Sequence, residues 1–145
     1  MLPANFIYRG VLHLDIIVGQ LLYLKLPFAD GGLCTYKRTF LVFEVAENRI
    51  KLFNASSISG KAHKLLFRSN IKVNNYWPPF KCPTFVKIDA VYDIEYLNLL
   101  DTAILANGQT LNTVDLNNIL SEYELYNDGV HTVAYNKAEV KSFNW

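Results

Sequence analysis

The stretch TFLVFEVAENRIKLFNASS, residues 39–57, decides the fold of this chain. It contains two runs rich in β-branched and aromatic residues, TFLVFEVAE at 39–47 and RIKLFNASS at 49–57, separated only by Asn48. Residues of these types suit a pleated, half-buried strand surface. Because the connection is so short, the stretch predicts an antiparallel hairpin with a tight turn at Glu47 and Asn48.

On the N-terminal side of the hairpin, QLLYLKLPF at 20–28 predicts another strand. This run stops at Pro27, which has no N–H for continued ladder pairing. The following segment, ADGGLCTYKR at 29–38, begins with an Asp-Gly-Gly turn signal and ends on two cations. It predicts a loop that leads into the hairpin.

On the C-terminal side, HKLLF at 63–67 predicts a third short strand. The segment NNYWPPFKCP at 74–83 contains three prolines and predicts an irregular excursion. TFVKIDAVYDIE at 84–95 is again strand-like, and its alternation places Lys87 and Asp89 on one face.

A helical pattern follows these strands. The segment LNTVDLNNILSEYELY at 111–126 repeats apolar residues at helical spacing, and Thr113 is the expected cap. The tail at 129–145 alternates with a period of two, which predicts a late strand or a loosely docked end. Strands first and a helix late indicate a mostly β (α+β) protein, a small, strongly bent antiparallel sheet or barrel with an appended helix.

Length and composition indicate one domain over residues 1–145. The chain is 51% hydrophobic, 14% aromatic and 19% charged, which suits a packed core rather than a disordered segment. The formal net charge of +1 gives no long-range attraction to nucleic acid or membranes. Any site for a polyanion must therefore come from local clustering of cations.

Cysteine usage and hydropathy favour a cytoplasmic protein. Cys34 and Cys82 are too few for a disulfide scaffold. Charged or polar residues interrupt every apolar run before it reaches transmembrane length, and no signal peptide pattern is visible, so no membrane association is expected. His13 and His131 have no neighbours at metal-ligand spacing, and we expect neither a metal nor a cofactor.

Residues suited to phosphate chemistry gather at three predicted strand ends or faces: Arg38, Ser56, Ser57, Lys61, His63, Lys64, Lys87 and Asp89. Metal-independent cleavage of RNA needs a base for the ribose 2′-hydroxyl, cations for the developing phosphorane charge, and an acid for the leaving oxygen. A carboxylate, a guanidinium and a hydroxyl can supply these parts. If the three strands are neighbours, the residues form one patch.

Each candidate also has an ordinary structural interpretation. Arg38 fits a solvated strand flank, and Ser56 and Ser57 fit a turn in which hydroxyls bond the local backbone. Lys87 and Asp89 fit an exposed charge pair that stabilises little. His63 fits the start of a strand.

The Gly-Lys pair at residues 60–61 does not form a nucleotide-binding loop. Ala62 follows where serine or threonine is needed, and Ala55 stands where the first glycine belongs. The lysines in this segment remain candidates for guiding a phosphate backbone.

Four segments in order resemble the PemK/MazF family of endoribonuclease toxins from bacterial type II toxin–antitoxin systems. GQLLYLKLPFADGG resembles the opening strand and flexible loop of that family, and YKRTFLVFEV its arginine-then-strand segment. IKLFNASSISG is similar to the strand that ends in a small hydroxyl residue, and FVKIDAVYDIE to the later strand with a basic residue and an aspartate two apart. The resemblance covers roughly residues 19–126, leaving an N-terminal extension at 1–18 and a C-terminal tail at 127–145.

The resemblance implies an SH3-like β-barrel of the PemK/MazF/CcdB type, a homodimer, and metal-independent cutting of single-stranded RNA that inhibits growth. It places Arg38 on the catalytic arginine and Ser56 on the hydroxyl residue that holds the scissile phosphate. Lys87 and Asp89 match a basic–acidic pair used in RNA binding and cleavage. It also implies a cognate antitoxin protein as partner.

The sequence departs from the family pattern in two places. Thr39 follows Arg38 where the family usually has proline, and Ser56 replaces the commoner threonine. Ser57 takes the hydroxyl role if the register slips by one residue.

These observations give one leading hypothesis and two alternatives. In the first, Arg38, Ser56 and Asp89 are catalytic, and Asp89 either acts as base or positions the RNA. RNA is then bound by further residues: Lys87, Ser57, Lys61, His63, Lys64, and Tyr36 or Trp77 stacked on unpaired bases. The alternatives are a non-catalytic barrel that acts by binding, as a gyrase-poison-like toxin or an interaction module, and a degenerate relative without activity.

Overall fold

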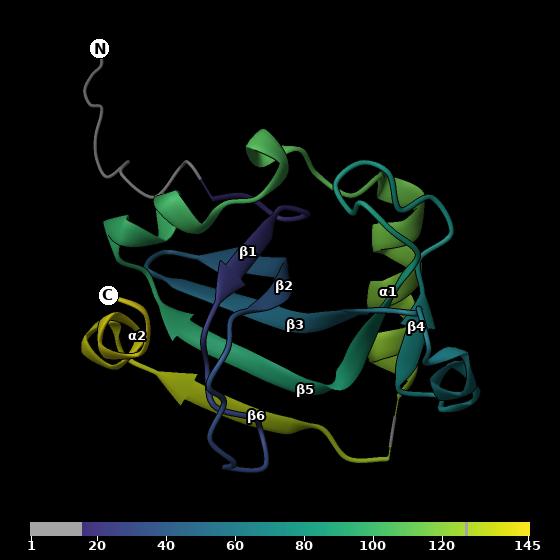
Figure 1. The fold of residues 1–145 in the computed structure, drawn as a ribbon, viewed down its shortest axis with the longest axis horizontal. Coiled ribbons are helices and arrows are strands. Elements are labelled where there is room, and N and C mark those ends of the chain that lie inside the picture. The colour runs from purple at the N-terminus through teal and green to yellow at the C-terminus, as the bar shows by residue number, and fades with distance from the viewer. Residues whose placement is uncertain (1–15, 127) are drawn as a thin grey trace.

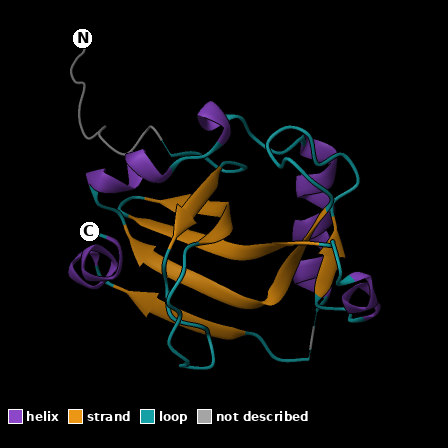
Figure 2. Cartoon of the chain, viewed as in Figure 1, coloured by secondary structure: helices purple, strands orange, loops and turns teal. Residues whose placement is uncertain are grey.

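The computed structural model describes residues 16–126 and 128–145, so the predicted extension at 1–18 falls largely outside the described residues (Figure 1). The strands are β1 (Leu21–Leu24), β2 (Arg38–Ala46), β3 (Arg49–Ser57), β4 (Asn70–Lys72), β5 (Thr84–Glu95) and β6 (His131–Tyr135). The helices are the 3-10 turns η2 (Ala62–Leu66), η3 (Asn98–Ala103) and η4 (Ala106–Gly108), and the α-helices α1 (Thr113–Leu125) and α2 (Lys137–Asn144). Figure 2 shows these helices around the periphery of the strands.

All six strands belong to one sheet in the order β1-β2-β3-β5-β4, and β6 also pairs with β5. Every pairing is antiparallel except that of β5 with β6, which is parallel. The sheet is not closed, so the protein is a mixed α+β fold built on an open six-stranded sheet.

The predicted hairpin is confirmed as β2 and β3. Ala46 pairs with Arg49, and the turn occupies Glu47 and Asn48, as the sequence predicted. The strand predicted at 84–95 is also confirmed, as β5.

A register break bends β5. Leu52 of β3 pairs with Tyr92, yet Asn54 pairs with Lys87, so β5 advances five residues while β3 advances two. Extra residues on one strand bend it and increase its twist. The first part of β5 therefore pairs with β4 and its last part with β6, and the bend is visible in Figure 1.

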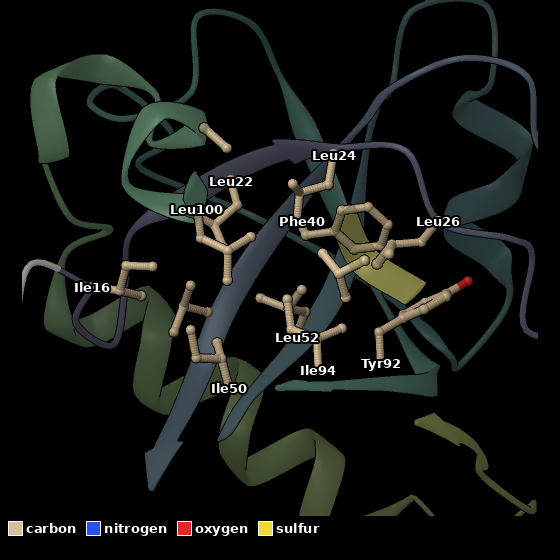
Figure 3. Packing of buried hydrophobic residues seen from close by; sticks show 13 residues of the cluster. Ile16, Leu22, Leu24, Leu26, Phe40, Ile50, Leu52, Tyr92, Ile94 and Leu100 are labelled. Atoms are coloured by element: carbon tan, nitrogen blue, oxygen red, sulfur yellow. The ribbon is translucent and has the colours of Figure 1, made fainter. Parts of the chain in front are cut away.

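Both faces of the sheet are covered by apolar side chains. On one face, Phe40 of β2 lies edge-on to Tyr92 of β5 (Figure 3), with 5.0 Å between ring centroids. Val140 of α2 is fully buried on the same side. On the other face, Phe43 and Phe53 stack with centroids 3.8 Å apart. Tyr123 of α1 packs edge-on against Phe53, so α1 covers this second face. Burial of such side chains is the main stabilising contribution to the fold.

The strand predicted at 63–67 is wrong, because these residues form the 3-10 turn η2. The backbone N–H of Lys64 donates to the Lys61 carbonyl, and that of Phe67 donates to the Lys64 carbonyl. The side-chain amide of Asn70 also donates to the Lys64 carbonyl at 2.9 Å. These local bonds use the groups that a ladder would need, and the strand forms later, as β4.

The tail at 129–145 contains the predicted late strand, β6, but also the helix α2, which the pattern did not predict. A capping box begins α2: Asn136 and Glu139 each accept a hydrogen bond from the other's backbone N–H. The cap of α1 also differs from prediction, because the side chain of Asn112, rather than Thr113, accepts from the Asp115 N–H.

The first strand is shorter than predicted. The sequence predicted a strand over 20–28, but β1 ends at Leu24. Directly after it, the backbone N–H and carbonyl of Lys25 bond to the side chain of Asn144, so side-chain hydrogen bonds replace the ladder there.

Candidate functional site

A surface pocket of about 210 Å³ opens where the first loop, three antiparallel strands and β6 meet. We call it the charged pocket. It is lined by Phe28, Ala29, Asp30, Arg38, Asn54, Lys87, Asp89, Ala90, Tyr92 and His131. Two cations, two carboxylates and an imidazole therefore share one hollow.

Arg38 begins β2 and is held rigidly in this pocket. Its Nη2 donates to the carbonyls of Leu26 at 2.9 Å and Pro27 at 3.3 Å. The guanidinium carbon lies 4.5 Å from the ring centroid of Phe28 and 5.5 Å from that of Tyr92, within cation–π range.

The charge of Arg38 has no carboxylate partner. Among the described residues none forms an ion pair with it, and its buried Nε has no hydrogen-bond partner. A guanidinium stays charged at any relevant pH, so this positive charge is available to an anion entering the pocket.

Lys87 faces the same pocket from β5. Burial lowers the pKa of its ammonium below the ordinary value of 10.5, and the nearby cations Lys64, Arg38 and Lys61 lower it further, while Asp89 acts in the opposite direction. These interactions place Lys61 and Lys64 within electrostatic reach of the charged pocket. We call the four cations Arg38, Lys61, Lys64 and Lys87 the positive region.

Asn54 lies between the two cationic strands. It pairs across the sheet with Phe40 on β2 and Lys87 on β5, and its side-chain amide donates to the Thr39 carbonyl at 3.1 Å. It is buried, and these bonds fix its orientation at the base of the pocket.

The two serines do not line the charged pocket. Ser56 and Ser57 line a second, mostly apolar pocket of about 350 Å³, which also contains Tyr23, Phe80 and the exposed Cys82. We call this the apolar pocket. The ammonium of Lys61 donates to the Ser56 hydroxyl at 3.2 Å, which links Ser56 to the positive region.

Ser57 has a local structural partner. Its hydroxyl accepts from the Ser59 N–H at 3.2 Å, as expected for a turn residue. Of the two serines, Ser56 is thus the one coupled to a cation.

The remaining candidates lie outside both pockets. His63 is exposed on η2, and Tyr36 is exposed on the loop before β2, edge-on to Phe28 at 6.3 Å. Trp77 is 68% exposed in the proline-rich segment. Cys34 and Cys82 are free thiols, and of the two Cys82 lines the apolar pocket.

Sequence reasoning missed His131 as a site residue. It lies far along the chain from Asp89, and only the parallel pairing of β6 with β5 brings it into the charged pocket. No local pattern signals such a pairing. Asn54 was missed as well, although a polar residue within an apolar strand is a visible signal.

The chain matches no known protein-family model, and no curated protein sequence matches it. The resemblance to PemK/MazF toxins therefore stays a prediction. Within residues 16–126 and 128–145, no helix is long and apolar enough to cross a bilayer. The same residues contain no group of three or more histidine, cysteine or acidic side chains placed to hold a metal ion.

Proposed function

We propose that the chain is an endoribonuclease that cuts single-stranded RNA without a metal, as the toxin of a type II toxin–antitoxin system. The observation that carries this proposal is the convergence of Arg38, Lys87 and Asp89 from two strands in one pocket. A carboxylate beside two cations is the minimum set for a reaction that removes a proton and builds negative charge on phosphorus.

The reaction follows from these groups. Asp89 takes the proton of the ribose 2′-hydroxyl, and the 2′-oxygen attacks the adjacent phosphorus. Arg38 and Lys87 stabilise the negative charge on the phosphorane oxygens. The bond to the 5′-oxygen then breaks, leaving a 2′,3′-cyclic phosphate and a 5′-hydroxyl end. Because the nucleophile belongs to the RNA, the protein need not activate water.

The cations beyond the pocket suit the flanking RNA. Lys61 and Lys64 would hold neighbouring phosphates, and Ser56, bonded to Lys61, would orient a phosphate oxygen. The resemblance further leads us to propose an SH3-like barrel type of architecture, a homodimer and a cognate antitoxin that covers the positive region.

Cleavage of a mixed single-stranded RNA by the purified protein tests this function. We expect Asp89→Asn and Lys87→Ala each to lower the cleavage rate about 10²-fold or more, because each removes a group used in the transition state. Arg38→Ala should be at least as damaging, with circular dichroism to check its fold. Arg68→Ala is the matched control, since Arg68 is exposed and pairs only loosely with Asp128 at 3.8 Å.

Two results would contradict the proposal. One is wild-type protein that leaves every RNA intact, and the other is an Asp89→Asn variant that cuts at the wild-type rate.

A specific observation also supports a second candidate, a barrel-like module that acts by binding. The guanidinium of Arg38 already donates to two backbone carbonyls and lies over aromatic rings. These contacts alone give Arg38 a structural role that needs no substrate. Under this alternative, growth inhibition in cells survives Asp89→Asn and Ser56→Ala. Under the endoribonuclease proposal, Asp89→Asn abolishes the inhibition.

A further inference from the structure

Among the residues that the structure describes, His131 is the one histidine that lines the charged pocket, and it comes from β6, outside β2, β3 and β5. It begins β6, its Cα is the partner of Ala90, and Ala90 directly follows Asp89. Its side chain is exposed, so a substrate can reach it. The pairing thus brings an imidazole and a carboxylate to the same hollow.

The position of His131 is set by the fold. The parallel ladder runs from Ala90 opposite His131 to Ile94 opposite Tyr135. At the far end of β6, Tyr135 packs edge-on against Phe143 of α2 at 5.3 Å between ring centroids. The strand is therefore anchored by backbone pairing along its length and by α2 at its end, which fixes the backbone position from which the imidazole projects.

Cleavage of the phosphodiester needs two proton transfers, one from the 2′-hydroxyl and one to the departing 5′-oxygen. The proposed mechanism assigns the first to Asp89 and leaves the second without a donor. Arg38 does not release a proton at any relevant pH, Asp89 starts as a base, and Lys87 is already assigned to the phosphorane charge. A protonated imidazole is the usual donor near neutral pH.

We propose that His131 is the general acid that protonates the 5′-oxygen leaving group. This inference rests on the proposed endoribonuclease function. As the 2′-oxygen to phosphorus bond forms, Asp89 gains the 2′-hydroxyl proton. As the phosphorus to 5′-oxygen bond breaks, an imidazolium N–H of His131 delivers its proton to that oxygen. Return of a proton from Asp89 to His131 through solvent restores both groups.

The charged groups that face His131 come from three other elements. Asp30 lies in the loop after β1, Arg38 on β2, and Lys87 and Asp89 on β5. The pH dependence of cleavage reports the whole set, so the decisive test must isolate the leaving-group step.

An RNA whose scissile 5′-oxygen is replaced by sulfur provides that test, because a thiolate leaves without needing an acid. On ordinary RNA, His131→Ala should cut about 10²- to 10⁴-fold more slowly than wild type. On the sulfur-substituted RNA, it should come within about tenfold of wild type.

Thr132→Ala is the matched control, since Thr132 is an exposed neighbour on β6 that does not line the pocket. It should cut both RNAs like wild type. His131→Gln, which keeps the bulk and polarity, should behave as His131→Ala does.

The other possible results would contradict either the acid role of His131 or the endoribonuclease function itself. If His131→Ala cuts ordinary RNA at the wild-type rate, or is slowed equally on both RNAs, His131 is not the acid although the endoribonuclease function stands. If wild-type protein cuts neither RNA, the proposed function itself fails, and the role of His131 fails with it.

Discussion

At the scale of residues, the two cations of the charged pocket differ in chemistry. Arg38 is permanently charged and is held by the carbonyls of Leu26 and Pro27. Lys87 is half-buried, and burial together with neighbouring cations lowers its pKa. Because its pKa is lower in the folded chain than in the unfolded chain, burial of the charged ammonium subtracts from the free energy of unfolding at pH values below both pKa values. That penalty is relieved as pH rises from the lowered pKa toward 10.5.

Binding of single strands should show the pKa of Lys87. A phosphate favours the protonated ammonium, so affinity should fall as pH rises through a value below the ordinary lysine pKa. Lys87→Arg should keep its affinity over the same range, because a guanidinium does not titrate there. Fluorescence anisotropy with an uncleavable 2′-deoxy oligonucleotide between about pH 7 and about pH 10 measures both curves.

Salt provides the control for this prediction. Lys87→Gln should reduce the slope of log affinity against log salt by about 0.7, the value for loss of one phosphate contact on a single strand. An unchanged slope together with an unchanged pH dependence would show that Lys87 does not contact the strand.

At the scale of elements, the first turn of α1 holds the proline-rich segment in place. Asp115 is 2% exposed, and its carboxylate accepts from the backbone N–H groups of Asn74 at 3.0 Å and Asn75 at 2.8 Å. The side-chain amide of Asn112 donates both to this carboxylate and to the Asn75 carbonyl. A loop without regular structure is thus fixed by one helix end.

Asp115→Ala should lower the free energy of unfolding by about 1–3 kcal/mol, because two backbone N–H groups lose their acceptor in a buried site. Urea unfolding followed by circular dichroism measures the change. Glu122→Ala, an exposed position on the same helix, is the control and should alter stability little. Equal stability of the two variants would contradict the anchoring role of Asp115.

At the scale of the whole molecule, the tail at 128–145 belongs to the main structure. Val140 is fully buried in the core, and Tyr135 and Phe143 pack against the same cluster. The side chain of Asn144 accepts from the Lys25 N–H at 2.7 Å and donates to the Lys25 carbonyl at 3.0 Å. These reciprocal bonds join the end of the chain to the segment after β1.

Truncation after Tyr126 should therefore abolish the cooperative unfolding transition or lower its urea midpoint sharply. The deletion removes β6 and α2, including the buried Val140, and exposes the apolar cluster around Tyr92 to water. Deletion of Trp145 alone, which is 43% exposed, is the control and should leave the midpoint nearly unchanged. A truncated protein that unfolds like the full chain would show that the tail is only docked.

Prediction from sequence succeeded where the signal was local. The β2-β3 hairpin followed from two strand-like runs joined by a two-residue turn, and β5 followed from alternation along its own length. It failed at η2, where apolar composition resembled a strand but local carbonyl bonding formed a turn. For the site, the sequence predicted Arg38, Lys87 and Asp89, but it also grouped with them His63, which lies outside the pocket.

By itself, the sequence determined the strands β2, β3 and β5, the helix α1 and the residue types available for phosphate chemistry, because these depend on neighbours a few positions apart. Only the tertiary structure decided which of those residues share a pocket. The parallel pairing of β6 with β5 brings His131 into the pocket that Asp89 lines, while Ser56 lines a different pocket. The physical reason is that strand register over long separations is set by packing of both sheet faces, which no local pattern encodes.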